Sequence, residues 1–98
     1  MNFKDKVVIV TGGTRGIGLE VAKSFYEKEA NVIIFGSKKE SVDKTVEELS
    51  KDNILVEGYY PNLNNYQEVV ETIDKIYNKY KRIDVLINNA GISANKKI

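Results

Sequence analysis

Short runs of consecutive apolar residues alternate along this chain with longer stretches in which apolar residues recur every three or four positions. An uninterrupted run rich in valine and isoleucine is typical of a strand that is buried on both faces. The pattern therefore predicts strands at residues 6–11, 31–35, 54–60 and 83–87, of which the third is the least regular.

Amphipathic helices are predicted between these strands, because the apolar residues there fall on one helical face. The three apolar stripes are Ile17, Val21, Ala22 and Phe25; Val42, Val46 and Leu49; and Val69, Val70, Ile73, Ile76 and Tyr77. Ser37 and Glu40 have the spacing of a capping box at the start of the second helix. Asn64 and Gln67 can cap the third helix in the same way.

The order of elements is β-α-β-α-β-α-β, with connections of about two to six residues, as is usual in α/β proteins. Right-handed crossovers stack such elements into a parallel sheet with helices on its faces. We therefore predict an α/β fold of the Rossmann type. Residues 1–98 belong to one domain, since no linker, repeat or low-complexity stretch interrupts the pattern.

Composition narrows the range of functions. With 42% hydrophobic and 30% charged residues among 98, the chain has the make-up of an ordinary globular protein. Its net charge is +1 and its charges are interspersed, whereas a nucleic-acid partner requires a clustered basic face. The absence of cysteine predicts no disulfide, no thiol nucleophile and no thiolate metal site. The absence of histidine removes the commonest general base and the commonest metal ligand, and no metal-binding residue is assigned. The N-terminal apolar run is too short for a signal sequence or a membrane span, so the cytoplasm is the expected location.

The first strand leads into a glycine-rich turn, TGGTRGIG, at residues 11–18. A phosphate-binding loop would need Lys and Ser or Thr where Leu19 and Glu20 stand, so that motif is excluded. Gly12, Gly16 and Gly18 instead have the spacing of a dinucleotide-binding turn, in which the backbone comes close to a pyrophosphate. A plain tight turn is the alternative, and the position after a buried strand favours the dinucleotide site.

The end of the second strand predicts which cofactor is bound. Proteins that select NAD place a carboxylate there for the ribose 2′-hydroxyl. Here residues 36–39 read Gly-Ser-Lys-Lys, and the first carboxylate is that of Glu40. A carboxylate would repel a 2′-phosphate, so its absence, with Arg15 and Lys38 nearby, favours NADP. Ser37 can cap the following helix or contact the phosphate, and these two roles are compatible.

The fourth strand is followed by NNAG at residues 88–91. Asparagine is a common turn former, which is the alternative to a role in binding. Together, TGGTRGIG and NNAG resemble the motifs of the short-chain dehydrogenase/reductase family of the TGxxxGxG type. Within that family, the opening MNFKDKVVIVTGGTRGIG and the asparagine in PNLNN at residues 61–65 are similar to those of 3-oxoacyl-acyl-carrier-protein reductases. The resemblance implies a cytoplasmic enzyme of fatty acid biosynthesis that reduces a ketone by hydride transfer from NADPH.

The resemblance also implies where the cofactor is held. The residues concerned are Gly12, Gly13, Thr14, Arg15, Gly16, Ile17 and Gly18 around the phosphates; Ser37 and Lys38 on the 2′-phosphate side; Asn62 and Leu63 at the adenine; and Asn89, Ala90 and Gly91 near the cofactor ribose. Asn88 is expected to tie the strand ends together instead.

In the family the catalytic Tyr, Lys and Ser and a supporting Asn follow the NNAG motif, so the resemblance assigns no catalytic residue to this chain. The resemblance implies that residues 1–98 are the N-terminal, NADP-binding part of a single Rossmann-fold domain that is truncated before its second half. We expect this 98-residue chain by itself to hold the cofactor without reducing a substrate. The full-length form is expected to be a homotetramer that acts on a small or acyl-carrier-protein-bound substrate. The alternatives are a short-chain dehydrogenase of a sugar, steroid or diketone, and a non-catalytic, truncated nucleotide-binding module.

Tyr77 and Lys81 match the Y-x-x-x-K spacing of the family's catalytic pair, but they end the third predicted helix. That end lies at the amino edge of the sheet, about 17 Å from the edge where ligands bind. Tyr77 is therefore expected in the core and Lys81 in solvent. In the predicted strand order, 3-2-1-4, the fourth strand is an apolar sheet edge of the kind that pairs with another chain.

Overall fold

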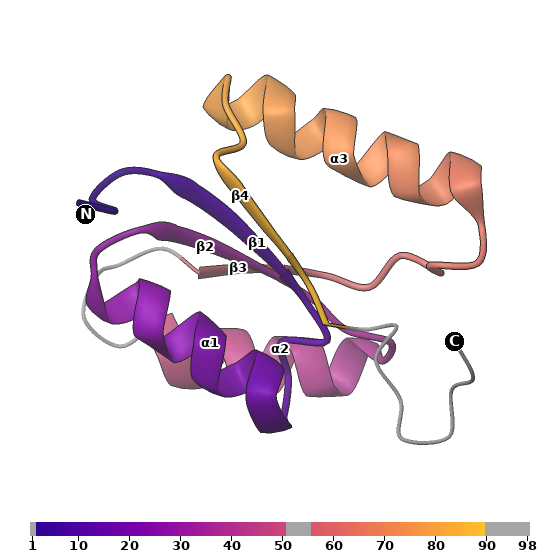
Figure 1. Ribbon diagram of the computed structural model, residues 1–98. Helices are drawn as coiled ribbons and strands as arrows, with labels where there is room; N and C mark the ends of the chain where they lie inside the picture. Colours follow the sequence, from indigo (N-terminus) through magenta and orange to yellow (C-terminus); the bar gives the residue numbers. More distant parts are fainter. Residues whose placement is uncertain (1, 51–55, 90–98) are drawn as a thin grey trace, which may run out of the picture.

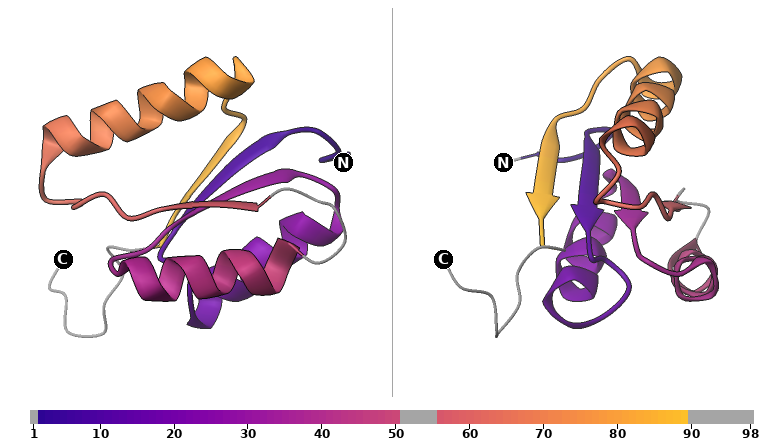
Figure 2. Two further views of the ribbon diagram at one scale, coloured as in Figure 1. Left: turned by 180° about the vertical axis from the view of Figure 1, so that it is seen from behind. Right: turned by 90° about the vertical axis from the view of Figure 1, so that its right-hand side faces the viewer.

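The structure is a computed structural model that describes residues 2–50 and 56–89. In these residues a parallel sheet has helices on both faces, with α1 and α2 on one side and α3 on the other (Figures 1 and 2). The elements are β1 (Val7–Thr11), α1 (Gly16–Glu27), β2 (Asn31–Phe35), α2 (Lys39–Leu49), β3 (Val56–Tyr59), α3 (Tyr66–Tyr80) and β4 (Val85–Asn88). The strand order is β3-β2-β1-β4, so the predicted α/β class, element order and strand order are confirmed.

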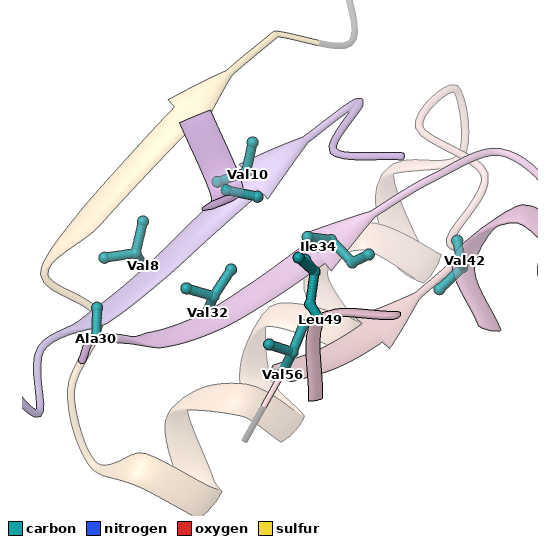
Figure 3. Packing of buried hydrophobic residues seen from close by; sticks show 9 residues of the cluster. Val8, Val10, Ala30, Val32, Ile34, Val42, Leu49 and Val56 are labelled. Atoms are coloured by element: carbon teal, nitrogen blue, oxygen red, sulfur yellow. The ribbon is translucent and has the colours of Figure 1, made fainter. Parts of the chain in front are cut away.

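The two central strands are buried because each has a neighbour on both sides and helices above and below. Val8 of β1 is in register with Val32 of β2 and with Val85 of β4. Alternate residues of the strands point to opposite faces, which divides the apolar side chains into two cores. The core beneath α1 and α2 contains Val8, Val10, Ala22, Ala30, Val32, Ile34, Val42, Leu49 and Val56 (Figure 3). The core beneath α3 contains Val7, Ile9, Ile33, Phe35 and Ile76.

Two residues that were assigned to the apolar stripes of the predicted helices are exposed instead of buried. Ile17 is 75% exposed, because the first turn of α1 projects beyond the sheet and the core begins at Gly18 and Ala22. Tyr77 is 51% exposed, because the face of α3 that meets the sheet passes through Ile76. Tyr80, which the stripe omitted, packs against that core instead, and Lys81 is exposed as predicted.

Both predicted helix caps are also displaced. The N-cap of α2 is Lys38, without a side-chain capping bond, so Ser37 lies one residue too early to form a box with Glu40. The N-cap of α3 is Asn65, whose Oδ1 accepts a hydrogen bond from the backbone N–H of Glu68 at 3.1 Å. The sequence offers Asn at both 64 and 65, and the cap falls on the residue with Glu three positions later.

The strand limits differ slightly from the prediction. The third strand covers Val56–Tyr59, and residues 54 and 55 of its predicted range lie outside the described residues. The fourth strand begins later, at Val85, because the side chain of the preceding residue, Asp84, binds the start of β1. Asp84 Oδ2 accepts from the Val7 N–H at 2.8 Å and also binds the Arg82 guanidinium, which together lower the pKa of Asp84 to about 2. Leu86 of β4 is 58% exposed, as expected of an edge strand.

A carboxylate attaches α3 to the far edge of the sheet. Glu57 of β3 accepts hydrogen bonds from Lys79 Nζ and Tyr80 Oη of α3, and from Tyr59 Oη at 2.9 Å. Burial raises the pKa of Glu57, but these hydrogen bonds outweigh burial and leave that pKa below its ordinary value. Burial, followed by the hydrogen bond and charge of Glu57, raises the pKa of Tyr59 to about 12. The same causes raise the pKa of Tyr80.

We expect Glu57→Gln to lower the free energy of unfolding by about 1 kcal/mol near neutral pH, since the carboxylate is partly exposed and its loss weakens the hydrogen bonds from all three donors. Stabilisation through a lowered carboxyl pKa is complete above the ordinary value of 4.5 and is lost as pH falls. Stabilisation through the raised Tyr59 pKa is complete below pH 10.0 and is lost as pH rises through about 12.

Urea unfolding of the wild type and Glu57→Gln tests this expectation at about pH 7 and about pH 11.5. The difference in stability should be largest near neutrality and should shrink at the alkaline pH. Glu47→Gln is the control, because Glu47 is an exposed carboxylate on α2. An equal deficit at both pH values would show that the charge of Glu57 does not stabilise the protonated tyrosines.

Candidate cofactor-binding site

A cleft of about 860 Å³ opens at the carboxyl ends of the strands. Its walls come from the β1–α1 turn, the end of β2, the β3–α3 loop and the end of β4. The lining residues are Gly12, Thr14, Arg15, Gly16, Ile17, Phe35, Gly36, Ser37, Tyr60, Pro61, Asn62, Leu63, Asn64, Glu68 and Asn89. The connection after β1 passes to one face of the sheet and the connection after β3 passes to the other, and the cleft lies at this change of direction, which is the usual ligand position in such folds.

A second hollow of about 560 Å³ runs along α1. It is lined by Gly16, Ile17, Leu19, Glu20, Val21 and Ser24. No strand end contributes to it, and polar groups from different elements do not converge there. The larger cleft is therefore the candidate site.

The glycine turn needs glycine for its backbone conformation. Gly12 has a φ of 65° and Gly16 a φ of 60°, both in the left-handed region that favours glycine. The N–H groups of Gly12 and Gly13 both donate to the carbonyl oxygen of Phe35, at 2.8 and 3.2 Å. These bonds hold the turn against the end of β2, so the walls from β1 and β2 keep a fixed separation.

Gly18 is required for close packing. A Cβ atom at Gly18 would lie 2.0 Å from the Gly12 carbonyl oxygen and 2.8 Å from Asn89 Nδ2. Asn89 Nδ2 itself donates to that same carbonyl oxygen at 3.4 Å. The first turn of α1, the glycine turn and the end of β4 thus meet at one point on the wall of the cleft.

Thr11 joins the ends of β1 and β4. Its hydroxyl accepts from the Asn89 N–H at 2.8 Å and lies 3.2 Å from Asn88 Oδ1, to which it donates. Asn88 therefore ties the strand ends together as expected, and the Asn89 backbone does so as well. The Asn89 side chain lines the cleft.

The N-terminus of α1 faces the cleft without a side-chain cap. Its N-cap residue, Arg15, is extended and makes no capping bond, and the first turn contains no acidic residue. The N–H groups at the start of a helix lack partners within the helix and favour a bound anion. Gly16 and Ile17 carry two of these groups and line the cleft beside the Arg15 side chain.

The end of β2 supplies Phe35, Gly36 and Ser37 to the cleft and no carboxylate. Among the described residues that line the cleft, Glu68 provides the carboxylate, from α3 rather than from β2. Ser37 is exposed and, since it does not cap α2, its hydroxyl is not committed to that helix.

Most of the predicted site residues line the cleft, but not all. Gly13 and Gly18 are buried behind it, where they shape the turn, and Lys38 is exposed outside its lining. Ala90 and Gly91 lie outside the described residues. Tyr77 and Lys81 take no part in the lining.

Sequence reasoning missed six lining residues: Phe35, Gly36, Tyr60, Pro61, Asn64 and Glu68. The rule that ligands bind beyond the carboxyl ends of strands could have indicated the whole 60–64 loop. No sequence pattern indicated that Glu68 lines the cleft, because Glu68 lies in the first turn of a helix and not in a loop after a strand. Only the three-dimensional position of α3 brings it to the cleft.

No helix of the described part of the chain is long and apolar enough to cross a membrane. Across residues 2–50 and 56–89, the acidic side chains form no group of three or more that could hold a metal ion.

A parallel sheet in the order 3-2-1-4, with a glycine turn after β1 and a cleft at the strand ends, defines a fold of the Rossmann type. Residues 6–98 match the family model described as short chain dehydrogenase. The chain therefore belongs to the short-chain dehydrogenase/reductase family of oxidoreductases.

Two relatives differ in the substrate that their names give. The chain is 43% identical over 95 residues to a 3alpha-hydroxysteroid dehydrogenase of Mediterraneibacter gnavus, covering 95% of this chain and 38% of that protein. It is 37% identical over 93 residues to the 3-oxoacyl-acyl-carrier-protein reductase FabG of Thermotoga maritima, again covering 95% of this chain and 38% of the relative. The chain thus spans well under half the length of these relatives.

Solved structures show the same fold. A metagenomic short-chain oxidoreductase in complex with NADP superimposes with a TM-score of 0.87 and 25% identity, covering 94% of this chain and 42% of that one. An NAD+-bound xylitol dehydrogenase gives a TM-score of 0.86 and 26% identity, covering 94% and 35%. The family binds nicotinamide cofactors, and its members differ in which one they bind.

Proposed function

We propose that this chain is the NADP(H)-binding part of a short-chain oxidoreductase that reduces a ketone by hydride transfer. One observation carries the choice of cofactor. The uncapped N-terminus of α1, the Arg15 side chain and Ser37 share one cleft, and the end of β2 contributes no carboxylate to it. A 2′-phosphate at this end would meet a guanidinium and a hydroxyl without a repelling charge.

The residues of the cleft fit such a cofactor. The N–H groups of Gly16 and Ile17 would hold the pyrophosphate, because they face the cleft at the positive end of a helix. Arg15 and Ser37 would hold the 2′-phosphate, and Asn89 would hold the ribose near the nicotinamide. When bound, NADPH supplies the hydride.

On the adenine side, Asn62 and Leu63 would form the pocket, and both line the cleft. Gly13 and Gly18 would contribute through the shape of the turn, and Lys38 through its positive charge near the phosphate side. Ala90 and Gly91 remain predicted members of the site.

For the substrate, we propose a 3-oxoacyl thioester carried by acyl carrier protein, in fatty acid biosynthesis. The resemblance of residues 1–18 and the similarity to FabG support this choice. A hydroxysteroid is the second candidate, because the relative with 43% identity is a 3alpha-hydroxysteroid dehydrogenase. Turnover of acetoacetyl thioester and of a 3-ketosteroid with NADPH, measured on the purified full-length protein, separates the two. We also propose a cytoplasmic homotetramer for the full-length form.

The cofactor proposal predicts that NADPH binds at least about tenfold more tightly than NADH, since a charge-assisted contact to the 2′-phosphate contributes about 1.5–3 kcal/mol. Fluorescence titration of the purified protein with each reduced nucleotide measures this ratio. Equal affinities, or tighter binding of NADH, would contradict the choice of NADP. If the full-length protein bound the nucleotide without turnover of any ketone, that result would favour a non-catalytic nucleotide-binding module.

A further inference from the structure

One side chain, that of Val42, seats the N-terminal half of α2 on the sheet. Val42 is fully buried in the core beneath α1 and α2 (Figure 3). A Cβ atom at Gly58 would lie 2.2 Å from Val42 Cγ1, and a Cβ atom at Gly36 would lie 2.6 Å from Val42 Cγ2. Gly58 belongs to β3 and Gly36 follows β2. Because neither residue has a side chain, the two glycines form a notch in the sheet that Val42 fills.

The contact between Val42 and Gly58 has no room to spare. Non-bonded carbon atoms pack at about 3.5–4.0 Å, so a Cβ atom at Gly58 would overlap the Val42 side chain. Valine has one strongly preferred rotamer in a helix, and each of its two methyl groups here faces one glycine of the notch. The same Cβ atom would also lie 2.8 Å from Val46 Cγ2, one turn further along the helix. A side chain at Gly58 would therefore force α2 away from β3.

Such a movement of α2 would reach the cleft at Ser37. The Val42 N–H donates to the Lys38 carbonyl oxygen at 3.1 Å, so the start of the helix moves together with Val42. Gly36 cannot follow, since its N–H donates to the carbonyl oxygen of Tyr59 in β3, also at 3.1 Å. The chain must therefore adjust at Ser37, which lies between the fixed end of β2 and the helix and lines the cleft.

We propose that Gly58 is a positioning residue for the selection of the cofactor. By leaving space for Val42, it sets the distance between Ser37 and the 2′-phosphate of NADP(H). Gly58 itself lies outside the cleft lining, so it acts on the cofactor only through α2. This inference rests on the proposed function, because it requires the 2′-phosphate to lie at Ser37. NADH has no 2′-phosphate, so displacement of Ser37 weakens the binding of NADPH selectively.

The test measures the ratio of NADPH to NADH affinity by fluorescence titration of the purified protein. In Gly58→Ala, the ratio should fall about fivefold or more, since a hydrogen bond to a charged group is displaced. The affinity for NADH should stay within about twofold of the wild type. Val42→Ile enlarges the other partner of the same contact and should lower the ratio as well. This second variant tests the inference even if Gly58→Ala does not fold.

Ser37→Ala shows whether Gly58 acts through Ser37. By itself, this substitution should lower the ratio about fivefold, because the hydroxyl that contacts the 2′-phosphate is removed. Adding Gly58→Ala to Ser37→Ala should then change the ratio by less than about twofold, since the contact that Gly58 positions is already lost. An equal effect of Gly58→Ala with and without the Ser37 hydroxyl would overturn the inference.

Leu49→Val controls for a general loss of stability. Leu49 packs in the same core at the other end of α2 (Figure 3), so its truncation loosens the helix without changing the notch. The ratio should stay within about twofold of the wild type. If Gly58→Ala and Val42→Ile lowered the melting temperature but left the ratio unchanged, Gly58 would be a packing residue only and the inference would be wrong. A wild type that showed no preference for NADPH would overturn the proposed function, and this inference with it.

Discussion

Replacing Gly18 by alanine is expected to lower the free energy of unfolding by about 2–3 kcal/mol and to weaken NADPH binding at least about tenfold. The new Cβ would lie 2.0 Å from the Gly12 carbonyl oxygen, which is backbone and cannot rotate away. The first turn of α1 must then move off the glycine turn. In a helix, alanine is more favourable than glycine by about 1 kcal/mol. A net loss of stability in Gly18→Ala can therefore come only from this clash.

The weaker binding of NADPH is expected from the same displacement of α1. The Gly12 carbonyl also accepts the Asn89 side chain, so displacing α1 disturbs the turn, the helix N–H groups and Asn89 together. Urea unfolding gives the stability change, and fluorescence titration gives the affinity. Both should change in parallel, because one movement causes them.

Gly16→Ala is the control for backbone conformation without a clash. Gly16 has a φ of 60°, and, apart from its chain neighbours and the backbone of its own helix, no heavy atom of the described residues lies within 4 Å of the position that a Cβ atom would take there. We expect a cost of about 1–2 kcal/mol from the left-handed conformation alone. A Gly18→Ala protein as stable as the wild type would show that α1 can approach the turn differently.

Replacing Ser37 by aspartate is expected to reverse the cofactor preference. A carboxylate at the end of β2 can accept from the ribose 2′-hydroxyl of NADH and repels the 2′-phosphate of NADPH. Losing a charge-assisted contact and gaining a repulsion should change the NADPH to NADH affinity ratio by about 100-fold or more. The Arg15 side chain lines the same cleft and would pair with the new carboxylate, which further removes its charge from the phosphate.

Ser41→Asp provides the matched control. Ser41 is exposed on α2 and does not line the cleft, so the substitution adds the same charge to the same region of the protein. It should leave the affinity ratio within about twofold of the wild type, since an exposed charge that makes no direct contact with the 2′-phosphate is weakened by solvent and salt. The ratio is measured by titrating each variant with both reduced nucleotides. If Ser37→Asp still preferred NADPH as strongly as the wild type, Ser37 would lie away from the 2′-phosphate.

The sheet and its helices could be predicted because their signals are local. The β2 run at Asn31–Phe35 was predicted to the residue, since its consecutive β-branched residues are typical of a buried strand and the run is closed by Gly36. The caps were harder to place. Two adjacent asparagines could each begin α3, and the cap falls on Asn65, which has Glu rather than Gln three positions later.

The apolar stripes predicted two buried residues wrongly near helix ends, for a related reason. Periodicity assigns a face to every residue of a helix, but only the part lying over the sheet becomes buried. Ile17 precedes that part, and Tyr77 lies beside it, so both are exposed despite their apolar character.

By itself, the sequence determined the α/β class, the order of the elements and the glycine turn, because spacing and side-chain type specify these within a few residues. The tertiary structure decided which groups share the cleft. Glu68 is distant from Gly12 along the chain and reaches the same cavity only through the placement of α3. The contact of Gly18 with Gly12 and Asn89 likewise depends on how closely α1 and β4 approach, a distance that packing sets and no local pattern encodes.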